Sequence, residues 1–327
     1  MTKKKFSAGA LKDLGLVIVF LLLVAVLAVA SGGTFVKGSN IINILKQTAV
    51  NGILAMGMTF VIISNGIDLS VGSTVGLTGV IACMLAHPME AGAVEGAAQY
   101  PLLVPILAAL VVGALVGLFN GFGIAYGGIP PFIVTLGSMS IVRGLALVIS
   151  KGSPVYDVTS RFEAIASIKL FGGFPILALY LIIVVAISAF VLQKTVFGRN
   201  VYAIGGNETA ASVSGLNVKR LRVIVYTIAG TLAGLCGLLV ASRTITGAPT
   251  AGQSYEMDAI AAAVIGGVSM SGGAGKWHGV VIGALMISVI ANGLDIMRIS
   301  SNYQQIIKGF IIIFAVLMDI RGKGKKN

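Results

Sequence analysis

Residues 175–192 read PILALYLIIVVAISAFVL, and residues 223–241 read VIVYTIAGTLAGLCGLLVA. Each run is close to the length of about 20 apolar residues that a helix needs to cross the hydrocarbon core of a bilayer. Between them, residues 203–222 read AIGGNETAASVSGLNVKRLR and are rich in small, polar and basic residues. The pattern predicts two membrane-spanning helices joined by a segment that lies in water.

Apolar runs of this kind recur along the whole chain. The 327 residues are 57% hydrophobic and 10% charged, and the mean hydropathy is +1.00, whereas about 25% of the residues in a soluble domain are charged. The expected spans are residues 14–30, 48–64, 70–86, 102–126, 132–150, 175–192, 222–241, 256–270, 277–295 and 304–320. We therefore predict an all-α, polytopic membrane protein with about ten transmembrane helices, in which residues 1–327 form a single transmembrane domain.

The placement of Lys and Arg predicts the orientation of the chain. With the N-terminus inside the cell, the inner loops and chain ends collect more Lys and Arg than the outer loops do, which is the usual bias of membrane proteins. Both termini and the loop at about 193–222 are then cytoplasmic. The net charge of +12 would suggest a nucleic-acid partner in a soluble chain. Here it marks cytoplasmic loops beside a lipid bilayer, and no nucleic-acid partner is expected.

The first expected span has a second interpretation. The basic start of the chain, the apolar core and the sequence AVA at 28–30 before Ser31 also fit a cleavable signal peptide. The apolar core at 14–30 is long for a signal peptide, so a retained helix is favoured. The mass of the mature protein distinguishes the two.

Glycine and cysteine both point to a tightly packed membrane interior. The chain has 44 Gly, and GSTVG (72–76), GALVGLFNG (113–121) and GTLAG (230–234) carry Gly four residues apart. This spacing favours close helix packing. Cys83 and Cys236 both fall within apolar spans, so neither a disulfide nor a metal site is expected.

Asp68 stands in a break between two apolar runs, SNGIDLSVGS at 64–73. A carboxylate near membrane depth is costly and usually functional. Two interpretations stay open, and they are compatible. Asp68 can cap a helix that starts near Leu69, or it can act in the substrate path or its gate.

Other polar residues give weaker signals. Ser70 in the same break, and Asn120 and Asn292 within spans, join Asp68 as candidate pathway or gating residues, although interhelical hydrogen bonds are the commoner role. The segment GGVSMSGGAGKW at 266–277 fails the spacing of a phosphate-binding loop. Nucleotide binding is therefore not expected in this chain. The sequence also shows no combination of nucleophile, base and acid, so catalysis is not expected either.

The polar segment itself predicts a short helix. Asn207 is a favoured N-cap, Glu208 would lie in a first helical turn, where an acid is stabilised, and Gly215 followed by Leu216 fits a C-terminal stop. The result is a helix of about two turns, roughly 10 Å long. Its small residues would let another protein pack closely against it.

Four stretches together resemble a known family. GNETAASVSGLNV (206–218) resembles the cytoplasmic loop of permease subunits in bacterial ABC importers. NGIDLSVGS (65–73), PTAGQSYEMDAIAAAVIGG (249–267) and SNYQQIIKGFIIIFAVLMD (301–319) resemble the ribose-type branch of simple-sugar permeases. The resemblance runs from about residue 40 to the C-terminus.

The resemblance implies a permease of the bacterial cell membrane that pairs with a second copy as a homodimer. A cytoplasmic ATP-binding subunit would dock on the region 203–217, and an extracytoplasmic sugar-binding protein would deliver the sugar. ATP and Mg²⁺ would bind the partner subunit, so no enzyme activity and no cofactor are expected in this chain. The implied ATPase-coupling residues are Asn207, Glu208, Thr209, Ala210, Ala211, Gly215 and Leu216.

In related importers, acidic residues of the binding protein dock onto basic residues of the permease, which here implies roles for Arg161, Arg243 and Arg298. Glu256 and Asp258 also match the family, without an assigned role.

An ion-coupled secondary carrier for a small polar solute is the alternative function. Such carriers usually need several buried carboxylates or a broken-helix ion site, and Asp68 and Asp295 are the candidates here. Uptake that requires ATP hydrolysis would separate the two classes.

Overall fold

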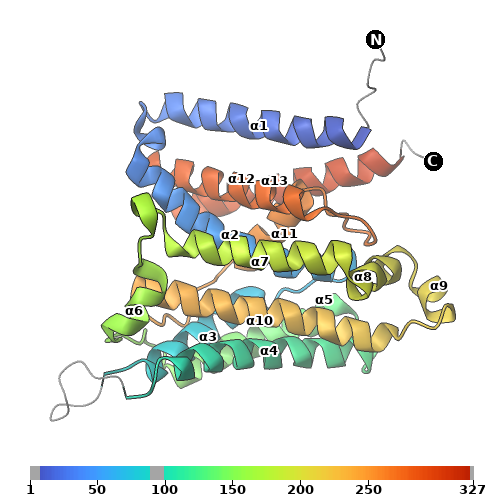
Figure 1. Cartoon of the computed structure of the whole chain (residues 1–327), viewed down its shortest axis with the longest axis horizontal. Coiled ribbons are helices and arrows are strands. Elements are labelled where there is room, and N and C mark those ends of the chain that lie inside the picture. The colour runs from blue at the N-terminus through green and yellow to red at the C-terminus, as the bar shows by residue number, and fades with distance from the viewer. Residues whose placement is uncertain (1–7, 89–98, 325–327) are drawn as a thin grey trace.

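The computed structural model describes residues 8–88 and 99–324, and the regular elements in these ranges are helices (Figure 1). The ten longer helices are α1 (Ala8–Ala30), α2 (Gly38–Ile63), α3 (Val71–Leu85), α4 (Leu103–Ala125), α5 (Pro131–Ile149), α7 (Ile176–Lys194), α10 (Val218–Thr244), α11 (Tyr255–Ile265), α12 (Trp277–Ile296) and α13 (Ser301–Gly324). Each corresponds to one expected span, and the all-α polytopic class is confirmed. The short elements are η1 (Thr34–Val36), α6 (Ser160–Ser167), η2 (Phe171–Gly173), α8 (Val196–Gly206) and α9 (Glu208–Val213).

Two of the ten helices are too short to cross a bilayer alone. In the described residues, α2, α4, α5, α7, α10 and α12 are both long and apolar enough to do so. The 15 residues of α3 and the 11 of α11 cover roughly 22 Å and 16 Å, against a hydrocarbon core of about 30 Å. The expected eighth span, 256–270, therefore ends early, at Ile265. Irregular segments 64–70 and 245–254 precede these helices, and such backbone is tolerated at membrane depth where protein buries it.

Helix α2 begins at Gly38, ten residues before the predicted start of that span, so this boundary was wrong. The first turns of α2 carry Asn40, Asn43 and Gln47, so their low hydropathy left them out of the predicted span. These residues are spaced three and four apart, which puts them on one face of a helix. That face lies against the ends of α10 and α12 rather than against lipid.

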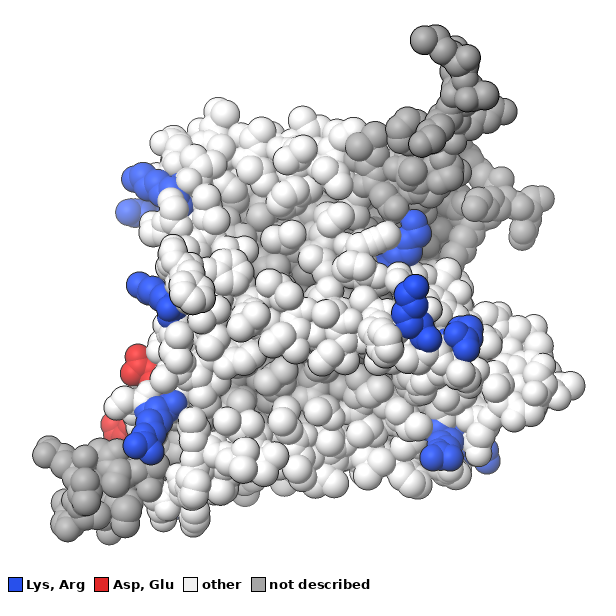
Figure 2. Space-filling model, viewed as in Figure 1, with Lys and Arg blue, Asp and Glu red and all other residues white. Residues whose placement is uncertain are grey.

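The exposed charges on one face of the molecule lie at its two ends. On the face shown in Figure 2, Lys and Arg lie at the left and right ends, Asp and Glu lie at the left end, and a wide band between the ends is uncharged. Helix α9 projects from one end, and the first turn of α1 and the last turn of α13 lie at that same end (Figure 1). This arrangement agrees with the prediction that the chain ends and the loop 193–222 share one side of the membrane. Residues 1–7 lie outside the described residues.

The packing of α2–α5 is repeated by α10–α13. Helix α3 packs on α4 and α5 and against α10, while α11 packs on α12 and α13 and against α2. Likewise α4 packs on α10, and α12 packs on α2. Helices α2 and α10 run in opposite directions along the bundle (Figure 1). This is the pattern of an inverted repeat, which in transporters places the substrate path near the boundary between the repeats.

Glycines hold α4 directly against α10. A Cβ atom added at Gly230 would overlap the carbonyl oxygen of Gly113, and one added at Gly117 would overlap that of Tyr226. The motifs GALVGLFNG and GTLAG are therefore partners of each other. The third motif, GSTVG, serves a different contact, which is described below.

Gly230→Ala is expected to destabilise the protein by about 1–3 kcal/mol, because the added methyl group forces the α4 and α10 backbones apart. Gly15→Ala in α1 is the matched control, since a Cβ atom there meets nothing within 4 Å. Thermal unfolding of the purified protein in one detergent measures both. Equal melting temperatures for the two variants would show that this contact is dispensable.

Candidate functional site

Helix α9 forms as its sequence predicts. The side chain of Asn207 accepts a hydrogen bond from the Ala210 backbone N–H at 2.9 Å, which caps the helix. Gly215 has φ +86, the left-handed conformation of a helix stop. The backbone N–H of Leu216 then donates to the Ala211 carbonyl at 3.1 Å. The predicted short helix with a cap and a stop is confirmed.

One face of α9 is anchored and the other is exposed. Ala211 packs in a small apolar cluster with Ile204 of α8 and Val218 of α10. Glu208 forms an ion pair of 2.7 Å with Arg222 of α10. Val213, the last residue of α9, is in contrast 84% exposed. A large apolar side chain in this position is available to another protein.

Helix α8 connects α9 to the end of α2 and to the loop before α12. Gly205 of α8 lies so close to the end of α2 that a Cβ atom would overlap the Ile63 carbonyl oxygen. That carbonyl accepts a hydrogen bond of 2.9 Å from Gly273, and the Tyr202 hydroxyl donates to the Gly275 carbonyl at 2.8 Å. A displacement of α9 would thus reach two elements: the end of α2, which leads into the break at 64–70, and the loop before α12.

Asp68, Ser70 and Asn120 come together in the interior. Both the backbone N–H and the hydroxyl of Ser70 donate to Asp68 Oδ1, at 2.8 and 2.7 Å, and Asn120 Nδ2 donates to Ser70 Oγ at 2.8 Å. Asp68 does not cap a helix that starts near Leu69, because α3 starts at Val71 and its N-cap residue is Ser70. Asp68 instead closes the turn before that residue. All three side chains are at most 1% exposed, so the cluster fixes the break between α2 and α3 and is closed off from the surface in this conformation.

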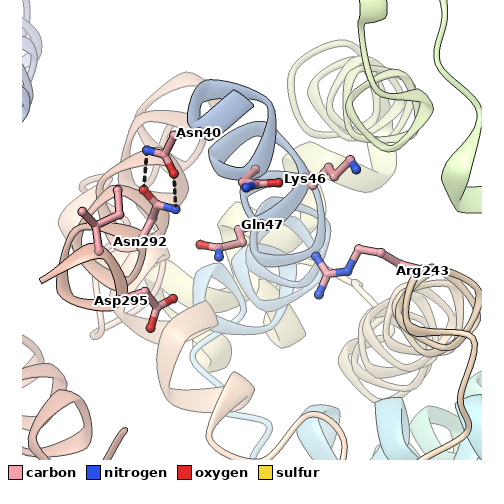
Figure 3. A pocket seen from close by; sticks show the side chains of 8 residues that line it. Asn40, Lys46, Gln47, Arg243, Asn292 and Asp295 are labelled. Carbon is pink, nitrogen blue, oxygen red and sulfur yellow. Dashed lines mark hydrogen bonds between the residues drawn. The ribbon is translucent and has the colours of Figure 1, made fainter. Parts of the chain in front are cut away.

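Asn292 lies elsewhere, at the end of the molecule opposite α9. It forms a reciprocal pair of hydrogen bonds with Asn40, at 2.8 and 2.9 Å. The pair borders a cavity of about 520 Å³ between the start of α2 and the ends of α10 and α12 (Figure 3). The cavity is lined by Asn40, Asn43, Lys46, Gln47, Arg243, Asn292, Asp295 and Ile296.

The three candidate docking arginines also lie at the end opposite α9. Arg243 is in the last turn of α10 and lines the cavity. Arg161 is exposed in α6, which packs on the end of α10 through hydrogen bonds from the Ser242 hydroxyl to the Phe162 carbonyl (2.7 Å) and from the Ala166 N–H to that hydroxyl (3.0 Å). Arg298 is exposed between α12 and α13.

A set of interior charges was not predicted as a site. Arg143 of α5 donates to the carbonyls of Pro249 and Ala251, the turn that leads into α11. Gly76 leaves room for this contact, because a Cβ atom there would lie 2.6 Å from the guanidinium. Gly72 likewise faces Glu256 of α11. The glycines of the motif GSTVG thus leave room on one surface of α3 for side chains of α5 and α11.

The second interior contact is an ion pair. Lys308 of α13 donates to Asp258 of α11 at 2.8 Å, and these side chains are 20% and 6% exposed. Helices α5 and α13 are therefore each bound by a cation to α11 or its leading turn. Lys308 and Asp258 stand 50 residues apart. The signal that could have drawn attention to them is that each is a charged residue inside an expected span.

Over residues 40–316 the sequence matches a family described as "Branched-chain amino acid transport system / permease component". The chain belongs to this permease family. It is therefore a permease subunit of a transport system. Its relatives and its apolar helices make it a multi-pass protein of the bacterial cell membrane.

Three relatives resemble this permease over almost their whole length. It is 41% identical over 306 residues to the ribose import permease protein RbsC of Haemophilus influenzae, with 92% of this chain and 91% of that protein covered. It is 40% identical over 317 residues to the protein of the same name from Bacillus subtilis, with 95% and 94% covered. It is 40% identical over 327 residues to the galactose/methyl galactoside import permease protein MglC of Salmonella typhimurium, with 98% and 97% covered. No solved structure matches the chain.

Proposed function

We propose that this permease is the membrane-spanning subunit of an ATP-driven importer that translocates a simple sugar. The observation that carries the proposal is the identity of about 40% to ribose and galactose import permeases over more than nine tenths of the chain. The family description names branched-chain amino acids. The individual relatives carry more weight because they align with this chain over almost all of both sequences.

An ATP-binding subunit docks on α9 from the cytoplasm. The exposed Val213, the cap at Asn207 and the anchoring ion pair of Glu208 support this role. Both chain ends lie on the same cytoplasmic side. ATP and Mg²⁺ bind that partner, and the permease itself, a single membrane domain, supplies no cofactor site.

A second copy of the permease completes the substrate path. Helices α5 and α13, which are bound to α11 by Arg143 and Lys308, also present exposed apolar side chains. These include Ile133, Leu136, Ile141, Leu145 and Val148 on α5 and Ile306, Phe310, Ile313 and Phe314 on α13. A face of this kind fits either lipid or a second protein. Both helices contact α11 or the turn that leads into it, which favours one shared partner, the second copy.

An extracytoplasmic binding protein delivers the sugar to the end opposite α9. Arg161, Arg243 and Arg298 supply positive charge there, and acidic residues of the binding protein would pair with them. Such charges mainly guide docking and fix its register.

Reconstitution tests the proposed function directly. Proteoliposomes that contain the permease, its ATP-binding partner and its binding protein are expected to take up labelled D-ribose or D-galactose only when ATP is hydrolysed. Ion-driven uptake by the permease alone would favour a secondary carrier. Uptake of leucine in place of either sugar would overturn the substrate class.

A further inference from the structure

We infer that the cavity between the start of α2 and the ends of α10 and α12 binds a monosaccharide directly and weakly, in the permease itself. The inference rests on the proposed function and adds a binding site to it. The cavity volume of about 520 Å³ falls within the range of roughly 300–1,000 Å³ that small-molecule sites occupy. It lies at the end opposite α9, where a delivered sugar would arrive.

The lining has the chemistry of a hydroxyl-binding site. Four carboxamides face the cavity, from Asn40, Asn43, Gln47 and Asn292. A carboxamide donates and accepts hydrogen bonds, as a sugar hydroxyl also does. The mutual hydrogen bonds of Asn40 and Asn292 hold their two amide groups in one orientation (Figure 3), so this side of the cavity is formed in advance.

Gln47 carries an unused acceptor. Its Oε1 atom is buried and has no hydrogen-bond partner among the residues that the structure describes. Buried polar atoms are rarely left without a partner, because the lost hydration is costly. Gln47 lines the cavity and extends toward its centre in Figure 3. A rotation of the side chain would turn this oxygen into the cavity, where a ligand hydroxyl could donate to it.

The charged groups of the lining leave one net positive charge. Lys46 and Arg243 contribute two cations and Asp295 one carboxylate, so the opposite charges partly offset each other. Asp295 Oδ1 accepts a hydrogen bond from Gln304 at 2.8 Å, which holds the carboxylate in place. The guanidinium of Arg243 has several donors in one plane, and it makes no hydrogen bond or ion pair with the described part of the chain. Such a plane can donate to two adjacent hydroxyls.

The site is expected to be weak. Ile296 is the one apolar side chain among its described lining residues, and none of these is aromatic. A sugar would therefore gain hydrogen bonds but no stacking contact with an aromatic ring, and we expect a dissociation constant on the order of 1 mM. Weak binding suits a transport protein, since a solute held tightly does not leave.

The test is saturation-transfer NMR on the full-length permease in lipid nanodiscs, titrated with D-ribose and with D-galactose. We expect saturable binding of at least one sugar in the millimolar range. Gln47→Leu should weaken it about fivefold, which is the loss of one or two neutral hydrogen bonds. Gln305→Leu makes the same change at an exposed residue near the start of α13 that does not line the cavity, and it should leave binding unchanged.

Thermal unfolding separates a binding role from a structural one. Gln47→Leu removes a buried unpaired polar atom, so its melting temperature should equal or exceed that of the native protein. Absence of sugar binding above that of empty nanodiscs, or equal binding by Gln47→Leu, would overturn the inference. Saturable binding of acetate but of neither sugar would also overturn it, and would assign the cavity to a carboxylate. If ATP-driven sugar uptake persists in these cases, the proposed function still stands.

Discussion

Asp258→Ala is expected to cost about 3 kcal/mol or more of stability. The substitution leaves the Lys308 ammonium as an uncompensated charge within a protein interior, and breaking a buried pair by removing one partner typically costs about 3–5 kcal/mol. The side chains of Asp258 and Lys308 are 6% and 20% exposed, so water screens the pair little. Thermal unfolding in a single detergent, at fixed protein concentration, measures the effect.

The double variant Asp258→Leu with Lys308→Met is the control. Replacing both members of a buried pair by apolar residues is often neutral or stabilising, so the double variant should regain the native melting temperature or exceed it. If it nevertheless fails to transport, the pair has a role in holding α13 to α11 that stability does not explain. A loss below about 1 kcal/mol in Asp258→Ala would match a solvated surface pair and contradict a buried contact.

Val213→Asp is expected to reduce ATP-driven uptake at least tenfold while the permease still folds and inserts. Val213 is 84% exposed on a face of α9 that is not anchored to the rest of the chain, so an acidic side chain costs little in the free subunit. In the proposed complex that face is buried against the ATP-binding partner, and a desolvated carboxylate there costs several times more than one hydrogen bond. A factor of ten corresponds to about 1.4 kcal/mol.

The readouts are co-purification with the ATP-binding partner, stimulated ATP hydrolysis and uptake, measured on the same preparation. Val36→Asp makes the same change at a 51% exposed valine of η1, away from α9, and should keep the coupling.

Glu208→Lys provides a second variant in α9, because it places a second cation beside Arg222 in place of the ion pair. Surface ion pairs contribute about 0–1 kcal/mol, so folding should persist while coupling falls. Normal uptake by both α9 variants would remove α9 from the proposed interface.

Several features could be derived from the sequence because they depend on local chemistry. The ten helices follow from apolar runs, which the bilayer requires irrespective of how helices pack. Helix α9 follows from Asn207 and Gly215, whose effects act within one turn. The local rule failed at α2, because the amides of Asn40 and Gln47 lower the hydropathy of a segment that is nevertheless helical.

The partners of the candidate site residues could not be predicted, because contacts between distant residues leave no pattern in the local sequence. The sequence identified Asp68 as a residue of interest, yet its partner Asn120 lies 52 positions away, and Asn292 proved to belong to a different part of the molecule. The glycine motifs predicted close packing without naming partners, and the structure pairs GALVGLFNG with GTLAG.

The sequence by itself thus determined the class of the protein, its ten longer helices and the form of α9. The tertiary structure decided which residues meet: Arg143 with the turn before α11, Lys308 with Asp258, and the amides of α2 with the end of α12. The physical reason is the range of the interactions. Capping and membrane insertion act over a few residues, whereas ion pairs and cavities form between helices whose relative positions depend on the whole bundle.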